Sequence, residues 1–422
     1  MVIALPANFS HALVAVNVPK LEDKQLKIED LTKILGSTIK HDDTNKTITF
    51  LGMLLTYTEE DQINIGFLAE SSTGKSYIPL ELSCYFPQDD LIEVGYASPT
   101  AFFHDYSALL KPVKGKRKAF AVDLHQKILI FIDQPHDLLL QRLRPILSHD
   151  KKVIRLMITD RNKNKNLRTS HILVQGYPTV IFASAKFSLS EQEKTRLLLL
   201  SPEVTQEKLK ESISLRLKKE SNRKAFRTFL ENDKERKFLI QKIQDIKQAK
   251  IESITIPSEL ADDIYERFME KHKELIPRHQ RDVSRLLALI KAIALLNFRH
   301  RERIDDSIVA TQEDVEAGFK LYENISEANE LGLSPELYNI YMKLKTFIEK
   351  KVGADLTGVT IADFQSFYGQ NFYRKLNYDA ARETLKIFVS MGLLTEELDQ
   401  FDRRIRRYLL PQCVLETKKS TQ

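Results

Sequence analysis

The sequence contains very little cysteine and no tryptophan. Its only two cysteines, Cys84 and Cys413, occur in 422 residues, too few for a disulfide framework or a cysteine-based zinc site. Long hydrophobic runs are also missing, since no apolar stretch reaches the roughly 18 residues that a membrane-spanning helix requires. The first residues carry neither a basic segment nor a signal-peptide cleavage site. We therefore expect a soluble, cytoplasmic protein with no membrane partner.

Neither sign of charge dominates the chain. The 64 basic and 58 acidic side chains give a net charge of +6 at pH 7, so the total does not by itself establish nucleic-acid binding. Basic residues are instead clustered at 111–118, 151–168, 208–250, 278–303 and 403–407. The length predicts two or three domains, because a single hydrophobic core rarely stabilises a chain of this length.

The most specific motif is AESSTGKS, which follows the apolar stretch INIGF and precedes the helical stretch YIPLELSCYF. Strand, loop and helix in this order are typical of a P-loop, whose backbone N–H groups surround phosphates while Lys75 neutralises their charge and Ser76 coordinates magnesium. Ala69 replaces the first glycine of the pattern, which leaves space but reduces backbone freedom. We predict that ATP and Mg²⁺ bind at Ala69, Glu70, Ser71, Ser72, Thr73, Gly74, Lys75 and Ser76.

A second motif, KILIFIDQ at 127–134, supplies the carboxylate that a phosphate-bound magnesium ion needs. P-loop enzymes place such a carboxylate at the end of a neighbouring apolar strand. Asp133 is therefore predicted to hold the metal and its water shell together with Ser76.

From these motifs onward, over roughly Ile63 to Ser326, the chain resembles the AAA+ superfamily. Within it the chain is similar to the group with a hairpin before sensor 1, which includes the minichromosome maintenance and superfamily 3 helicases. The resemblance implies a glutamate after Asp133, where this sequence has Gln134. An amide orients water but does not accept its proton, so we expect ATP to bind and to be hydrolysed slowly.

Two explanations of Gln134 stay open: a substitution introduced to trap the bound state, or a natural protein that works without this base. His136 is an alternative base, although a capping role at a helix start suits it better.

The resemblance also assigns roles to residues after Asp133. Two apolar stretches around DRNKNKN would form the hairpin that such motors project into a pore, with Arg161, Lys163 and Lys165 gripping DNA phosphates; an ordinary solvated turn is the alternative. Ser184 is the best match to sensor 1, although the usual asparagine is absent.

Two further arginines take roles from the same resemblance. Arg196 would be the arginine finger that reaches the neighbouring subunit's ATP; a surface salt bridge is the alternative. Arg281 would be the sensor 2 arginine, and Arg278 and Arg285 remain open alternatives.

The predicted fold class is α/β: an AAA+ P-loop core with a parallel sheet and a helical lid, followed by a C-terminal winged helix-turn-helix domain. Four parts are expected: a small strand-rich lead-in at 1–60, the α/β ATPase core at 61–202, a charged helical insert and lid at 203–330, and the winged helix at 331–422. Asn377 is the predicted N-cap of the third helix of that last domain.

We therefore expect an ATP-dependent DNA helicase or translocase that forms a ring, with a hexamer as the expected homo-oligomer. The lead-in lacks the large DNA-binding domain and zinc site of cellular replicative relatives, which favours a mobile element. A primase or polymerase as partner stays open. An AAA+ regulator that loads a recombinase, transposase or polymerase is the second hypothesis. A nucleotide switch that rarely hydrolyses ATP is the third.

Overall fold

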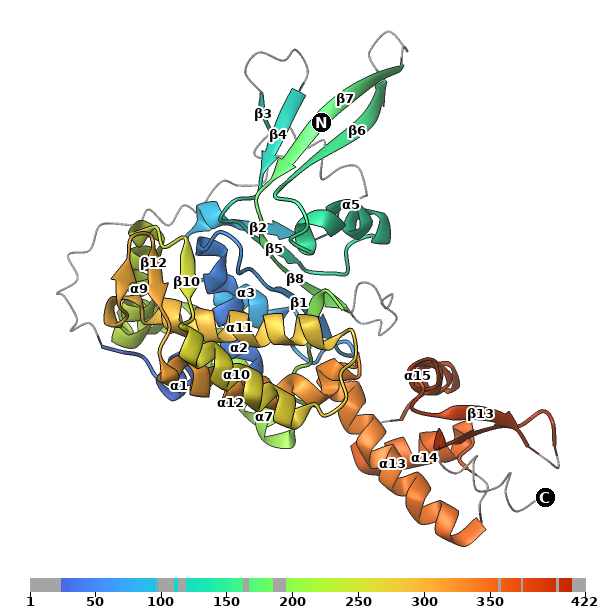
Figure 1. Ribbon diagram of the computed structural model, residues 1–422. Coiled ribbons are helices and arrows are strands. Elements are labelled where there is room, and N and C mark those ends of the chain that lie inside the picture. The colour runs from blue at the N-terminus through green and yellow to red at the C-terminus, as the bar shows by residue number, and fades with distance from the viewer. Residues whose placement is uncertain are drawn as a thin grey trace, which may run out of the picture.

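The computed structural model has a central α/β body, a projecting β-arm and a mainly helical C-terminal unit (Figure 1). In Figure 1 the β-arm rises above the body and the C-terminal unit lies at its lower right. The structure describes residues 24–95, 97, 110–112, 119–161, 167–184, 195–355, 358–372, 375–399 and 402–411. Within these ranges, no helix has the length and the apolar composition needed to cross a membrane.

The body is built on a parallel sheet of five strands in the order β2-β5-β8-β1-β9. These strands are β1 (Asn64–Leu68), β2 (Leu91–Val94), β5 (Ile128–Phe131), β8 (Thr179–Ser184) and β9 (Leu197–Leu200). Every residue of β1, β5, β8 and β9 is buried, as expected of a parallel sheet covered on both faces. The predicted α/β fold with a parallel sheet is confirmed. The strand before Asp133 is not the direct neighbour of β1, however, because β8 lies between them.

Two hydrophobic cores cover the two faces of this sheet. Alternate side chains serve each core, since Ile65 and Phe67 of β1 point to one face and Leu68 to the other. The first core includes α1 (Ile28–Leu35), α2 (Asp43–Leu54), α3 (Tyr77–Ser83), α9 (Lys234–Ala249), α10 (Ser258–Lys271), α11 (His279–Leu296) and α12 (Gln312–Glu330). The second includes α5 (Asp137–Leu147) and the base of the β-arm. A short 3-10 helix, η2 (Gln88–Asp90), leads into β2.

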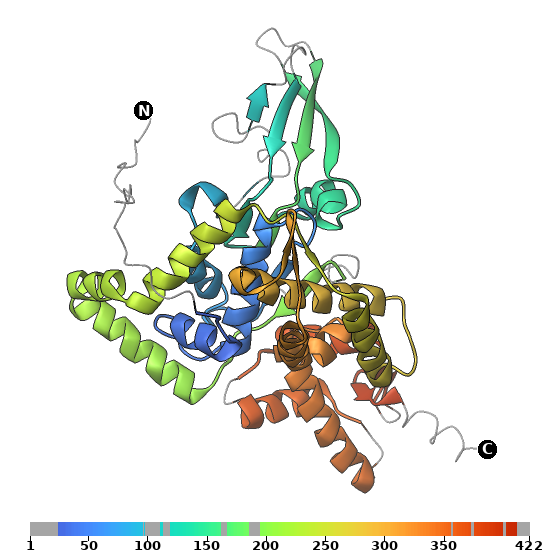
Figure 2. The ribbon, with the colours of Figure 1, turned by 60° about the vertical axis from the view of Figure 1, so that its left-hand side comes forward.

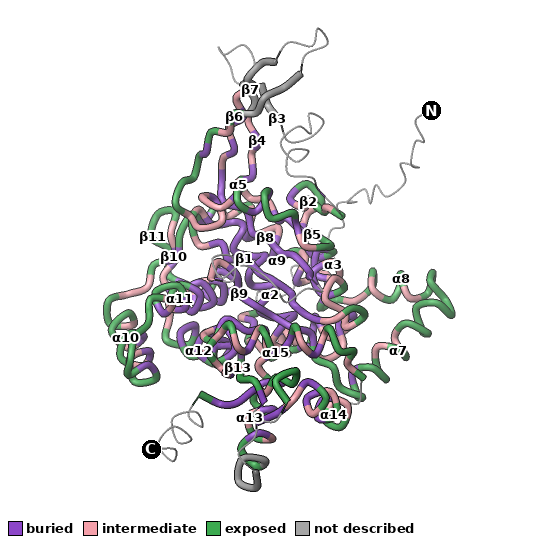
Figure 3. The backbone as a smooth tube through the Cα atoms, turned by 90° about the vertical axis from the view of Figure 1, so that its right-hand side faces the viewer, coloured by how far each residue is buried: buried purple, intermediate pink, exposed green. Residues whose placement is uncertain are grey.

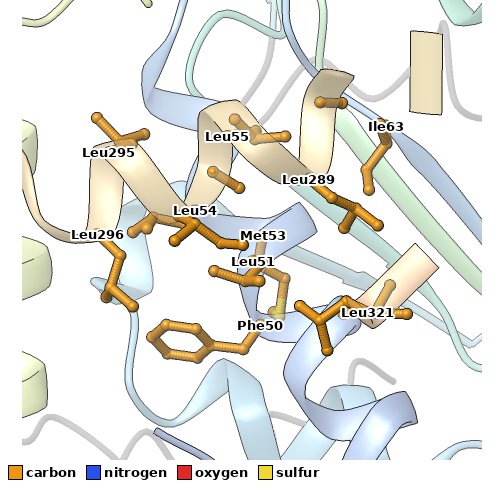
Figure 4. Close-up of a cluster of buried hydrophobic side chains, with 14 of the residues drawn as sticks. Phe50, Leu51, Met53, Leu54, Leu55, Ile63, Leu289, Leu295, Leu296 and Leu321 are labelled. Atoms are coloured by element: carbon orange, nitrogen blue, oxygen red, sulfur yellow. The ribbon is translucent and has the colours of Figure 1, made fainter. Parts of the chain in front are cut away.

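The strand-rich lead-in predicted for residues 1–60 is wrong where the structure describes it. Residues 24–60 form α1, α2 and the 3-10 helix η1 (Leu55–Tyr57), and no strand. Every residue from Asn45 to Leu54 is buried, so α2 has no polar face that would reveal a helical period in the sequence. Figure 4 shows α2 side chains packed against leucines of α11, which places this segment inside the body.

The helices predicted in the charged segment after β9 are confirmed. They are α7 (Gln206–Ser221), α8 (Arg223–Asn232) and α9, and their N-cap side chains are Thr205, Asn222 and Asp233. The last helix packs into the first core, whereas α7 and α8 extend away from the body at the left of Figure 2.

Three further helices, α10, α11 and α12, lie in the part of the chain predicted to be helical, residues 203–330. The small sheet between them was not predicted, because its strands are only two or three residues long. Those strands are β10 (Ser253–Thr255), β11 (Arg303–Ile304) and β12 (Ser307–Val309), and the 3-10 helix η3 (Phe298–His300) follows α11. Thr311 opens α12 with the predicted capping box, completed by Asp314.

The β-arm is a four-stranded sheet in the order β3-β4-β7-β6. Its strands are β3 (Leu110–Pro112), β4 (Ala119–Asp123), β6 (Val153–Arg161) and β7 (Leu167–Gln175). The antiparallel pairing of β6 with β7 confirms the two strands of the predicted hairpin. Strands β3 and β4, which widen this hairpin into an arm, were not predicted.

The C-terminal unit has its own hydrophobic core. It comprises α13 (Pro335–Asp355), α14 (Ile361–Phe372), α15 (Tyr378–Ser390) and the antiparallel pair β13 (Thr395–Leu398) and β14 (Arg406–Leu409). The side chain of Asn377 accepts a hydrogen bond from the N–H of Ala380 at 2.8 Å, as an N-cap does. Gly392, just after α15, has a φ of +70°, which allows the chain to turn toward β13.

A buried ion pair at the start of α12 gives a test of this fold. Arg301 donates from Nε and Nη2 to the two carboxylate oxygens of Asp314 at 2.7 and 2.6 Å, and both side chains are buried. Arg301→Ala should lower the free energy of unfolding by about 3–5 kcal/mol, since it leaves a buried carboxylate uncompensated. Urea denaturation measures this loss. As a control, Lys320→Ala breaks only the exposed pair with Glu29 and should cost less than about 1 kcal/mol; equal losses would contradict the account.

Candidate functional site

The loop 69–76 joins β1 to α3 at the carboxyl edge of the sheet. The N–H of Ala69 donates to the carbonyl of Ser184 at 3.3 Å, which holds the start of the loop on β8. Ser72 and Gly74 have φ values of +67° and +97°, a region that glycine adopts at little cost. Among the described residues, no atom lies within 4 Å of a Cβ built on Gly74. A side chain at position 74 would therefore point into open space.

Three of the predicted groups meet at this edge. The Nζ of Lys75 donates to the carbonyl of Glu70 at 3.3 Å, so the ammonium group lies against its own loop. The hydroxyl of Ser76 donates to the carbonyl of Ile132 at 3.3 Å, one residue before the exposed Asp133. Hydroxyl and carboxylate oxygens are the hard donors that Mg²⁺ prefers, so the residues present fit the expected ion.

Gln134 lies between the end of β8 and the start of α5. Its Oε1 accepts a hydrogen bond from the buried hydroxyl of Ser184 at 2.8 Å, and its Nε2 lies 3.5 Å from Oδ1 of Asp137. The Nδ1 of His136 accepts from the N–H of Leu138 at 3.2 Å, so His136 is the N-cap of α5. Gln134, predicted to orient an attacking water, and Ser184, predicted to be sensor 1, are thus in direct contact.

Lys208, in the first turn of α7, brings a second ammonium group to the loop. Its Nζ lies 3.5 Å from the carbonyl of Thr73 and 2.8 Å from that of Glu203, and it forms an ion pair with the carboxylate of Asp42. Lys208 and Asp42 are both buried. This contact was not predicted, because a lysine in a charged segment carries no signal of contact with a residue 135 positions away.

The C-terminal unit also touches the loop. The hydroxyl of Tyr368, in α14, donates to Oε1 of Glu70 at 3.3 Å, and the tyrosine is buried. This contact joins residues that are 298 positions apart. No motif in the sequence predicted it.

Arg196 and Arg281 lie at the amino edge of the sheet, opposite the loop. Arg196 immediately precedes β9, whose first residue, Leu197, pairs with Asn64 at the start of β1. Both arginines line a cleft of about 480 Å³. The length of β1 separates the two edges by roughly 16 Å, at about 3.3 Å per residue. Within one chain, neither arginine side chain spans that distance to the P-loop.

The other two candidate arginines of α11 take part in a buried ion pair network. Arg285 donates to the carbonyls of Thr195 and Leu197 at 3.0 and 2.6 Å, and to Oδ1 of Asp282 at 2.7 Å. Burial lowers the pKa of Arg285 to about 10 and raises that of Asp282. Arg278 lies 3.6 Å from the same carboxylate. The contacts of Arg285 fix α11 to β9, whereas Arg278 pairs with a carboxylate of α11 itself.

The predicted DNA-gripping residues lie at and just after the end of β6 in the sequence. Arg161 is the last residue of β6, but its side chain, and Lys163 and Lys165 as a whole, lie outside the described residues.

The chain was compared with known proteins. No family model matches it, and no curated protein sequence is significantly similar to it.

The loop geometry predicts the effect of one substitution. Gly74→Ala meets no steric obstacle among the described residues but must keep a φ of +97°, which costs an alanine about 1–3 kcal/mol. The loop should relax, and affinity for a fluorescent ATP analogue should fall tenfold or more. The matched control is Gly95→Ala, which also enters open space but at a φ outside the left-handed region. Equal affinities for the two variants would show that the loop conformation does not matter for binding.

Proposed function

We propose that the chain is an AAA+ ATPase that translocates along DNA in the cytoplasm as a ring of identical subunits, in the replication of a mobile element. The observation that carries this proposal is the distribution of polar and charged side chains over the two edges of the sheet. Lys75, Ser76, Asp133 and Gln134 meet at the carboxyl edge, and Arg196 lies with Arg281 at the amino edge.

The carboxyl edge supports nucleotide binding. Backbone N–H groups of the loop surround the phosphates, and Lys75 leaves the carbonyl of Glu70 to neutralise their charge. Ser76 and Asp133 would hold Mg²⁺, which when bound neutralises charge on the phosphate oxygens. Lys208 keeps the loop in place through the carbonyl of Thr73.

In the proposed mechanism, Gln134 limits the rate of ATP hydrolysis. The hydroxyl of Ser184 fixes the side-chain amide at 2.8 Å, so that the amide orients a water molecule beside the phosphates. A neutral amide does not take the proton of that water, whereas a glutamate does. The chain therefore binds ATP and turns it over slowly.

A second copy of the chain completes the site. Arg196 and Arg281 share one cleft at the edge opposite their own loop, so they act on the nucleotide of a neighbour. An interface between two different surfaces repeats from copy to copy and closes into a ring when the rotation allows it. A hexamer is the expected ring.

DNA contact is assigned to the β-arm and the C-terminal unit. The β-arm projects from the body (Figure 1), and its strand β6 ends at Arg161. In the sequence, Lys163 and Lys165 follow between β6 and β7. Three helices followed by an antiparallel strand pair suit a winged helix, in which α15 would enter the major groove. Arg403 and Arg404 lie exposed between β13 and β14, where a wing contacts phosphates.

The alternative function is an AAA+ regulator or loader that works as a nucleotide switch. Two contacts favour this alternative. The first is the hydrogen bond from Ser184 to the side-chain oxygen of Gln134. The second is the hydrogen bond from Tyr368 to Glu70, through which nucleotide in the loop would influence the C-terminal unit. Such a switch would bind DNA and hand it to a recombinase, transposase or polymerase.

ATP turnover separates the two functions. The chain and its Gln134→Glu variant are each assayed with and without single-stranded and forked DNA. For a motor, Gln134→Glu should raise turnover at least tenfold and DNA should stimulate it further. Lys75→Ala is the control that removes ATP binding. If both proteins bind ATP but neither hydrolyses it with DNA present, the motor is contradicted and the switch is supported.

A further inference from the structure

Helix α7 carries an apolar surface that nothing in the described part of the chain covers. Leu209, Ile213 and Leu217 are 40%, 59% and 65% exposed, and their spacing of four residues places them along one side of the helix. We call these three residues the α7 stripe. Most other residues of α7 are charged or polar, so the stripe is an apolar strip with a polar rim, as in protein interfaces.

A second apolar surface lies in the turn between α10 and α11. Leu275 and Ile276 are 57% and 48% exposed and adjacent in sequence. We call these two residues the turn patch. Figure 2 shows the α7–α8 projection and the α10–α11 turn on opposite sides of the body, and Figure 3, from another side, places α7 and α10 at opposite ends as well.

Each surface adjoins one half of the proposed ATPase site. The stripe begins one residue after Lys208, whose Nζ lies 3.5 Å from the P-loop carbonyl of Thr73. The turn patch leads within five residues to Arg281, which lines the cleft with Arg196. A copy that places these arginines over a neighbour's loop therefore brings its turn patch to the start of the neighbour's α7.

We infer that the α7 stripe of each subunit is the docking surface for the turn patch of the next copy of this chain. This inference rests on the proposed function, since the shared nucleotide site brings the two surfaces together. Two unlike surfaces on opposite sides of one subunit make a head-to-tail interface, which is the kind that closes into rings. The inference also gives a role to the long charged segment after β9, which would contact the neighbouring subunit.

The test uses two full-length variants whose changes lie in the exposed surfaces. Ile213→Glu places a charge in the stripe, and Leu275→Glu places one in the turn patch; burying an unpaired carboxylate should weaken association at least tenfold. Leu398→Glu, at a side chain that is 57% exposed in β13, is the matched control. Sedimentation velocity with Mg²⁺ and a non-hydrolysable ATP analogue measures assembly, and thermal unfolding checks that each variant is folded.

The wild type and Leu398→Glu should assemble, whereas Ile213→Glu and Leu275→Glu should each remain monomeric alone. An equimolar mixture of these two variants should form dimers, because one intact stripe meets one intact turn patch. Wild-type monomers, undiminished assembly of either variant, or a mixture that stays monomeric would overturn the inference. ATP binding and turnover of the wild type, measured in the same samples, test the proposed function separately. If the wild type hydrolyses ATP and the Ile213→Glu variant still assembles as well as the wild type, only the docking surface is overturned.

Discussion

The parallel order of the five central strands gives the body two unlike edges, and this polarity is the constraint on which the proposed function depends. Every strand ends at the carboxyl edge, so Ser76, Asp133, Gln134 and Ser184 meet there although they lie far apart in sequence. Residues that precede strands lie at the opposite edge, as Arg196 does before β9. In the proposed function, one chain therefore carries both halves of the ATPase site without bringing them together.

This separation makes assembly part of the proposed chemistry. A positive group that stabilises transferred phosphate is effective only when it is placed over the phosphate, and here a neighbour must place it. The buried network of Asp282 and Arg285 fixes α11 to β9 and so orients the start of α11 toward the cleft. Lys208 fixes α7 to the loop in the same way. Stability and site geometry thus depend on the same buried polar contacts.

The sequence predicted most of the parts but few of their contacts. Local patterns predicted three of these parts. A motif marks the loop 69–76, an apolar run marks the strand before Asp133, and a helical period marks the helices after β9. Helix α2 was missed because its residues are buried on all sides, and β-branched residues in it imitate a strand. Lys208 and Tyr368 were missed because their contacts with the loop depend on tertiary packing, which leaves no local signal.

The most direct test of a shared site is ATP turnover per chain as a function of chain concentration, with the assembled fraction measured by sedimentation in the same solutions. If the arginines of one copy act on the nucleotide of another, turnover per chain should rise with concentration in proportion to the assembled fraction and should nearly vanish for dilute monomers. ATP binding to the P-loop should persist in those monomers. Turnover per chain that stays constant down to fully monomeric concentrations would contradict the account, because each chain would then complete its own site.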